Sequence, residues 1–260
     1  MAELARAASG GLLTVPRAAE VLGVSTHEAA VRLGRLERGG GLARARRGLY
    51  LVLPIEATPG NAAIAEDAWV LAAELFAPCY IGGWTAAEHW ALTEQLFRST
   101  FVVSAAPRRR QSENRLSTEF QIVRVRPDRM KGTSSVWRGG QRVAVSDRER
   151  TIVDGLVHPQ WVGGVRHLAE MFTTYRESKE FDPKKLAAQA EGHATGSAFK
   201  RLGYLAERLW PNEKTIIDLA YENRTKGIIR LDPSVTSRGK MSKRWGLWAN
   251  VTIDGAAVDS

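Results

Sequence analysis

The spacing around Gly23 restricts the fold of the N-terminal region more than any other feature of the chain. Ala19 precedes Gly23 by four residues, and a Val-Ser pair ending at Ser25 follows it. A small residue at this distance lets two helices cross closely, and glycine readily adopts the turn between them. The pattern predicts a helix-turn-helix unit formed by residues 16–22 and Thr26–Arg38.

The second predicted helix is amphipathic. Ala29, Leu33 and Leu36 form its apolar stripe, and the opposite face is polar and basic. Two short strand-like runs, residues 42–44 and 48–52, then predict an arginine-rich hairpin, which makes the unit a winged helix. Basic and polar side chains on the second helix can reach base edges of DNA, and arginines on the hairpin can contact its phosphates or its minor groove. The predicted DNA-binding residues are Thr26, His27, Arg32, Arg35, Arg38, Arg44, Arg46 and Arg47. The alternative is a winged-helix module for protein interaction or dimerisation.

The rest of the chain predicts a second, larger domain. Pro54, Pro59 and Gly60 surround a polar stretch typical of a linker, and beyond it helical and strand-like patterns are mixed. The predicted fold is therefore α+β, with a winged helix-turn-helix domain at residues 1–53, a linker at 54–61 and an α+β domain at 62–260.

The net charge of +9 is unevenly distributed along the chain. Residues 1–53 carry 8 basic and 4 acidic side chains, residues 107–150 carry 12 and 5, and residues 223–260 carry 7 and 3. Residues 54–106 carry 1 and 6. Separate basic blocks favour surfaces that face a polyanion. The alternative is a compositional bias towards arginine without a binding role.

Composition excludes several classes of protein. A single cysteine, Cys79, excludes a disulfide framework and any multi-thiolate metal site. No apolar stretch approaches the length of a transmembrane helix, and the N-terminus lacks the apolar segment of a signal peptide. The expectation is a cytoplasmic protein without a membrane partner.

The sequence contains no persuasive catalytic pattern. Its histidines are scattered, and no metal-binding HExxH pair, GxSxG motif or phosphate-binding loop occurs. Asp147, Glu149 and Asp154 form the one acidic group near arginines. Helix capping by Asp147 and an i, i+4 pair between Arg150 and Asp154 account for these residues without catalysis. We therefore expect no enzymatic activity, no cofactor and no metal.

Three runs stand out: YIGGWTAAEHWALTEQ at residues 80–95, VSDRERTIVD at 145–154 and RLGYL at 201–205. In order and spacing they resemble the AbiEi antitoxin family. With the predicted winged helix, the resemblance covers nearly the whole chain. Thr85 and Ala91 stand where many relatives have serine and glycine.

The resemblance implies a bacterial antitoxin of a type IV toxin–antitoxin system. Such a protein neutralises a nucleotidyltransferase-like toxin, with or without direct contact, and represses its own operon by binding inverted repeats in operator DNA. It also implies that the larger domain provides the antitoxin activity. Two other functions stay open: a nuclease or other nucleic-acid-modifying enzyme built on Asp147, Glu149 and Asp154, and a stand-alone transcription regulator that responds to a ligand.

Overall fold

A computed structural model describes residues 1–54, 63–107 and 110–253. The fold is α+β, as predicted. The chain divides into two compact units. Unit 1 comprises Met1–Ile81, Arg98–Met130 and Ser134–Val145, and unit 2 comprises Gly82–Phe97, Lys131–Thr133 and Ser146–Ser260. This division differs from the predicted domain boundaries, because unit 1 contains more than residues 1–53. The predicted linker, apart from Pro54, lies outside the described residues.

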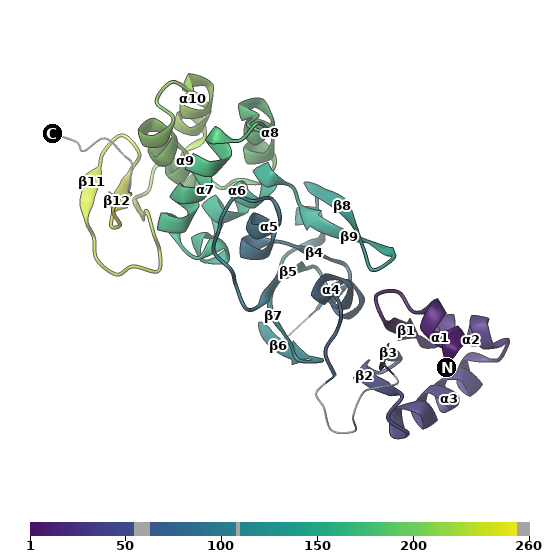
Figure 1. The fold of residues 1–260 in the computed structure, drawn as a ribbon. Coiled ribbons are helices and arrows are strands. Elements are labelled where there is room, and N and C mark those ends of the chain that lie inside the picture. The colour runs from purple at the N-terminus through teal and green to yellow at the C-terminus, as the bar shows by residue number, and fades with distance from the viewer. Residues whose placement is uncertain (55–62, 108–109, 254–260) are drawn as a thin grey trace. The chain divides into compact units, whose positions relative to one another are not determined.

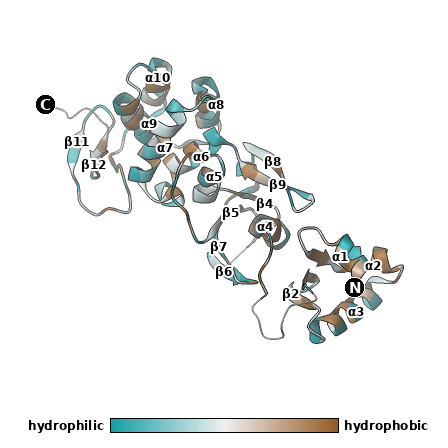
Figure 2. Cartoon of the chain, in the orientation of Figure 1, coloured by the Kyte–Doolittle hydropathy of each residue, from teal (hydrophilic) through white to brown (hydrophobic). Residues whose placement is uncertain are grey.

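The N-terminal segment of unit 1 combines three helices with a small antiparallel sheet in the order β1-β3-β2. Its elements are α1 (Ala2–Ala7), β1 (Leu12–Thr14), α2 (Val15–Leu22), α3 (Thr26–Arg38), β2 (Leu42–Arg46) and β3 (Leu49–Val52). Ala18, Ala29 and Leu33 lie in its core, so the predicted apolar stripe of α3 does face inward. Hydrophobic and hydrophilic positions alternate along α3 in Figure 2.

Local chemistry accounts for the turn between α2 and α3. Gly23 adopts the left-handed conformation with φ of 62°, and its N–H donates to the carbonyls of Ala19 and Glu20. Ser25 then caps α3: its hydroxyl accepts from the Glu28 N–H at 3.2 Å, and the Glu28 carboxylate accepts from the Ser25 N–H at 3.1 Å. This capping box gives α3 a sharply defined first turn.

The larger sheet has six strands in the order β6-β7-β5-β4-β9-β8 (Figure 1). The strands are β4 (Cys79–Ile81), β5 (Thr100–Ser104), β6 (Ser112–Arg115), β7 (Thr118–Arg124), β8 (Thr133–Arg138) and β9 (Gln141–Ser146). Helix α4 (Ala68–Phe76) packs on it through an edge-to-face contact between Phe76 and Phe120. A short 3-10 helix, η1 (Pro127–Arg129), follows β7.

Two sequence predictions in this region were wrong, and a third was confirmed. The sequence predicts a break in the helical pattern at residues 80–83, and β4 ends within it. The basic stretch at residues 107–116 predicts a loop, but β6 lies there. The spacing of Ala65, Trp69 and Ala72 predicts a helix over residues 62–75. The helix begins only at Ala68, where Asp67 caps it by accepting from the N–H groups of Trp69 and Val70. Local signals were overridden by strand pairing and by this cap.

Unit 2 is mainly helical. Its helices are α5 (Gly83–His89), α6 (Arg148–Val157), η2 (Pro159–Val162), α7 (Val165–Glu177), α8 (Pro183–His193), α9 (Gly196–Leu209) and α10 (Lys214–Asn223). A small sheet follows in the order β10-β12-β11, made of β10 (Ile229–Arg230), β11 (Lys240–Ser242) and β12 (Leu247–Ala249). Phe172, Leu202 and Trp245 belong to its continuous apolar core. Within the described ranges, no helix combines the length and apolar character needed to cross a membrane.

Asp232 joins the end of β10 to the start of α7. One carboxylate oxygen accepts from the Val165 N–H at 2.9 Å, and the other accepts from the Ser234 N–H at 2.9 Å and from its hydroxyl at 2.5 Å. Burial raises the pKa of Asp232, but these hydrogen bonds and the nearby Arg201 guanidinium outweigh it, so the pKa lies below its usual value.

We expect Asp232 to contribute a pH-dependent part of the stability of unit 2. Because its pKa is lower in the folded than in the unfolded chain, the contribution is present above the unfolded pKa of about 4 and is lost as the pH falls through the folded pKa. Urea unfolding of wild type and Asp232→Asn between neutral pH and about pH 3 checks this. The stability difference between them should shrink on acidification, and a constant difference would contradict the assignment.

Candidate nucleic-acid interface

The structure brings the predicted DNA-binding residues together on the outer side of α3 and on the β2–β3 hairpin. All of them are exposed. We call this group the α3–hairpin surface; it consists of Thr26, His27, Arg32, Arg35, Arg38, Arg44, Arg46 and Arg47. The pattern follows from the amphipathic sequence of α3, because burying Ala29 and Leu33 turns its polar positions to solvent.

The exposed face of α3 borders an open hollow of about 680 Å³. Val31 and Gly34 line it from the helix, and Arg38 and Arg44 lie at its border with Glu37. Val31 is 41% exposed although it is apolar. A surface that combines free cations with an apolar position suits the major groove, where phosphates and thymine methyl groups are both accessible.

The arginines of the α3–hairpin surface are not neutralised by any carboxylate in residues 1–54, 63–107 and 110–253. Within the described part of the chain, none of the six forms an ion pair, whereas Arg17 on α2 pairs with Glu20 at 2.6 Å. Arg38 donates to the Gly34 carbonyl at 3.2 Å, and Arg46 to the Glu74 carbonyl at 3.0 Å. These contacts hold the side chains but leave their positive charge uncompensated.

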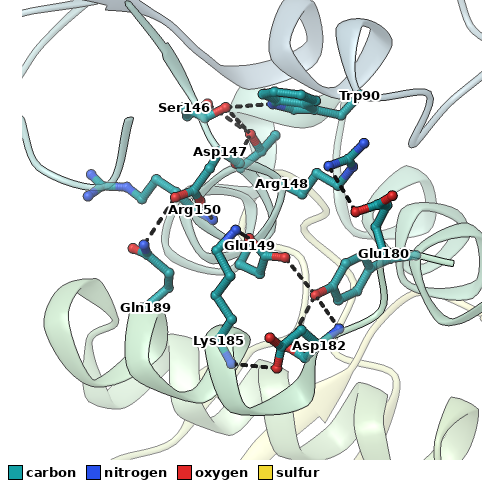
Figure 3. A network of polar contacts seen from close by, with 12 residues as sticks. Trp90, Ser146, Asp147, Arg148, Glu149, Arg150, Glu180, Asp182, Lys185 and Gln189 are labelled. Carbon is teal, nitrogen blue, oxygen red and sulfur yellow. Dashed lines mark hydrogen bonds and ion pairs between the residues drawn. The ribbon is translucent and has the colours of Figure 1, made fainter. Parts of the chain in front are cut away.

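Asp147 and Glu149, two of the three carboxylates of the alternative nuclease site, lie at the start of α6 in a polar network (Figure 3). The third, Asp154, lies further along the same helix. Asp147 caps the helix by accepting from the Arg150 N–H at 2.8 Å, and its other oxygen accepts from Gln189 Nε2 at 3.2 Å. Burial raises the pKa of Asp147 even though the Arg150 N–H opposes the shift.

Glu149 and Asp154 point to different partners. Glu149 is 2% exposed; one of its oxygens accepts from the Tyr175 hydroxyl at 2.8 Å, and the other lies 2.7 Å from Lys185 Nζ. Burial raises the pKa of Tyr175, so its hydroxyl stays protonated and donates to Glu149. Asp154 accepts from Arg150 Nε at 2.8 Å. We call these residues, with Asp147 and Gln189, the α6 polar network.

The carboxylates of the α6 polar network bind partners on different helices and do not converge on a common site. Glu149 connects α6 with Tyr175 on α7 and Lys185 on α8. Among the described residues, no group of three histidine, cysteine, aspartate or glutamate side chains is placed to hold a metal ion. Sequence analysis missed Tyr175 and Lys185, and no local signal identifies them, because their partner lies on a different helix.

Comparison with known proteins identifies a shared fold. No protein-family model matches the chain, and no curated protein matches it. The structure is similar to the crystal structure of the RV2827C protein from Mycobacterium tuberculosis, with a TM-score of 0.57 and 14% sequence identity. The likeness covers 91% of this chain and 85% of that one. The chain therefore shares, over most of its length, the fold of this mycobacterial protein.

Proposed function

We propose that this chain is a DNA-binding antitoxin of a type IV toxin–antitoxin system, which represses its own operon and neutralises a nucleotidyltransferase-like toxin. The observation that carries the DNA-binding part is the α3–hairpin surface, whose exposed arginines form no ion pair with any carboxylate of the described residues. The antitoxin part rests on the three sequence runs that resemble the AbiEi family. The organisation of α2, α3 and the β2–β3 hairpin supports a winged helix.

In this proposal α3 enters the major groove of operator DNA. Its N-terminal residues Thr26 and His27 and the outward Arg35 face base edges, while Arg46 and Arg47 on the hairpin contact phosphates. An inverted-repeat operator would be bound by two copies, because the symmetry of the site then matches that of the protein pair.

The run VSDRERTIVD at residues 145–154 serves a scaffold role in the proposal. It spans the end of β9 and most of α6, and its acidic side chains are engaged within the α6 polar network. The antitoxin activity would then come from surfaces that this network supports, without a catalytic step at Asp147, Glu149 or Asp154.

Replacing Arg46 and Arg47 together with alanine is expected to weaken operator binding and its dependence on salt. If the protein neutralises about six phosphates, the logarithm of its association constant for operator DNA falls with the logarithm of the salt concentration with a slope near −5. Losing the two phosphate contacts of Arg46 and Arg47 should reduce the magnitude of this slope by about 2. Fluorescence anisotropy with DNA from upstream of the gene, over a range of salt concentrations, measures both quantities. Arg35→Ala is expected to weaken binding about tenfold and to relax base preference.

The matched control is Arg176→Ala, an exposed arginine on α7 that pairs with Glu213. It should leave both affinity and slope unchanged. A slope that is flat in wild type, or equal losses in Arg176→Ala and the hairpin variant, would contradict the assigned surface.

Co-expression with a neighbouring nucleotidyltransferase-like gene tests the antitoxin part. The full-length chain is expected to restore growth. The Arg46→Ala/Arg47→Ala variant should restore it equally while failing to repress a reporter driven by the operon promoter, because the proposal assigns the two activities to different surfaces. Failure of the wild-type chain to restore growth would contradict the antitoxin role and leave DNA binding as a separate result.

A further inference from the structure

Trp137 is an exposed aromatic residue on the larger sheet. It lies on β8, the edge strand, next to the Gly139-Gly140 turn whose residues have φ values of 51° and 80°. The Trp137 side chain is 70% exposed. Tryptophan usually buries most of its surface, so a ring in this position offers a large binding contact at little conformational cost.

Arg142 on β9 lies next to the Trp137 ring. Its guanidinium carbon lies over the indole, 5.3 Å from the ring centroid. Arg142 forms no ion pair within the described residues. By contrast, the guanidinium carbon of Arg138 lies over the Trp69 ring, 4.4 Å from its centroid, and Arg138 pairs with Asp67 at 3.5 Å. Arg142 and Trp137 therefore form an exposed cation–aromatic pair whose charge is not compensated.

The surroundings of the pair distinguish between possible partners. The hairpin, residues 133–146, contains two arginines and no acidic residue. The other exposed positions on β8 are Thr133 and Ser135, so Trp137 is not part of a continuous apolar patch along this strand. A protein interface needs an apolar core of several residues. A nucleobase needs one aromatic face, with a cation near its phosphate.

We propose that Trp137 and Arg142 form a stacking site for an unpaired base of single-stranded nucleic acid. The base would stack on the exposed indole, and Arg142 would hold the ring and attract the adjacent phosphate. Bases in a duplex are already stacked on their neighbours, so the site would favour unpaired ones. This site is separate from the α3–hairpin surface and does not depend on the proposed repression of an operon.

Fluorescence anisotropy of the full-length protein with a labelled, mixed-sequence single strand of about 12 nucleotides tests the proposal. Trp137→Ala is expected to weaken binding about 5- to 150-fold, the range for losing one stacked base, and Trp137→Phe should retain most of the affinity. Arg142→Ala should weaken binding and its salt dependence. The matched control is Tyr221→Ala, which removes a 43% exposed aromatic ring beside Arg224 and should have no effect.

A strand of the same length made of abasic sites separates stacking from charge, because it keeps the phosphates and lacks the bases. It should bind the wild-type protein about as weakly as the normal strand binds Trp137→Ala. The same strand made as RNA shows which nucleic acid binds more tightly. Bound bases should also quench wild-type tryptophan fluorescence, and Trp137→Phe should lose this quenching while still binding.

Three results would overturn the proposal. They are an unchanged affinity in Trp137→Ala, an equal loss in Tyr221→Ala, and equally tight binding of the abasic strand. Weakened self-association in Trp137→Ala, with unchanged strand binding, would show instead that the ring contacts protein. Circular dichroism confirms that each variant is folded. The proposed function is tested separately, with duplex operator DNA. Trp137→Ala should bind this duplex like wild type, whereas Arg35→Ala should bind it more weakly.

Discussion

Replacing Arg150 with alanine is expected to lower the free energy of unfolding by about 3–5 kcal/mol. Arg150 is 3% exposed, its Nε donates to Asp154 at 2.8 Å, and its Nη1 donates to the Lys131 carbonyl at 2.8 Å. Asp154 is 4% exposed, so the substitution leaves a buried carboxylate without this ion pair. Removing one partner of a buried pair costs more than the pair itself contributes, because the remaining charge stays desolvated.

Urea unfolding of the full-length chain measures this loss, and Arg148→Ala is the matched control. Arg148 precedes Glu149 on the same helix, and its guanidinium lies 4.7 Å over Trp90 and 3.9 Å from Glu180. Its side chain is 30% exposed, so we expect a loss of at most about 1 kcal/mol. Similar losses in the two variants would show that burial of the Arg150–Asp154 pair does not determine the stability of α6.

Gly203→Ala is expected to destabilise unit 2 by about 3 kcal/mol, at the upper end of the cost of overpacking a core. Gly203 lies in α9, and an added Cβ would come within 1.9 Å of the six-membered ring of Trp245. That indole is fully buried, and its Nε1 donates to Glu207 at 2.6 Å. The ring has no room to move aside without losing this hydrogen bond, so the backbone of α9 must shift.

Gly192→Ala provides the control for this prediction. Gly192 is also helical, in α8, and no atom lies within 4 Å of the Cβ that the substitution adds. Alanine there should stabilise the chain by about 0.5–1 kcal/mol, since glycine is the poorer helix former. Thermal unfolding should therefore shift in opposite directions for the two variants. A stabilised Gly203→Ala variant would mean that Trp245 does not pack against α9 as described.

The N-terminal segment was the most predictable part of the molecule. The capping residue Ser25 and the apolar spacing of α3 are local signals, and the helix has the predicted bounds, Thr26–Arg38. The exposure of the five residues of the α3–hairpin surface that lie on α3 followed from the same amphipathic pattern. Their role in binding DNA stays a prediction, because exposure and charge are necessary for it but are shared by other surfaces.

Strands without a strong local pattern were not predictable. β6 has the sequence Ser-Glu-Asn-Arg, which lacks the residues that favour strands. It forms because it pairs antiparallel with β7, with Ser112 opposite Gln121 and Arg115 opposite Thr118. β4 is shorter still, with three residues, and it lies between β5 and β9 in the sheet. Such pairing depends on segments that the local sequence does not contain.

The sequence by itself determined the α+β class, the turn at Gly23 and the two faces of α3, because these depend on hydrogen bonds and side-chain spacing within a few residues. The local pairing of Arg150 with Asp154 also followed from the sequence, whereas tertiary structure alone decided the partners of Glu149 and the exposure of Trp137. Tyr175 reaches Glu149 from α7, and Trp137 stays 70% exposed on the edge strand β8. These properties arise from contacts between distant segments, whose burial and partners exist only once the chain has folded.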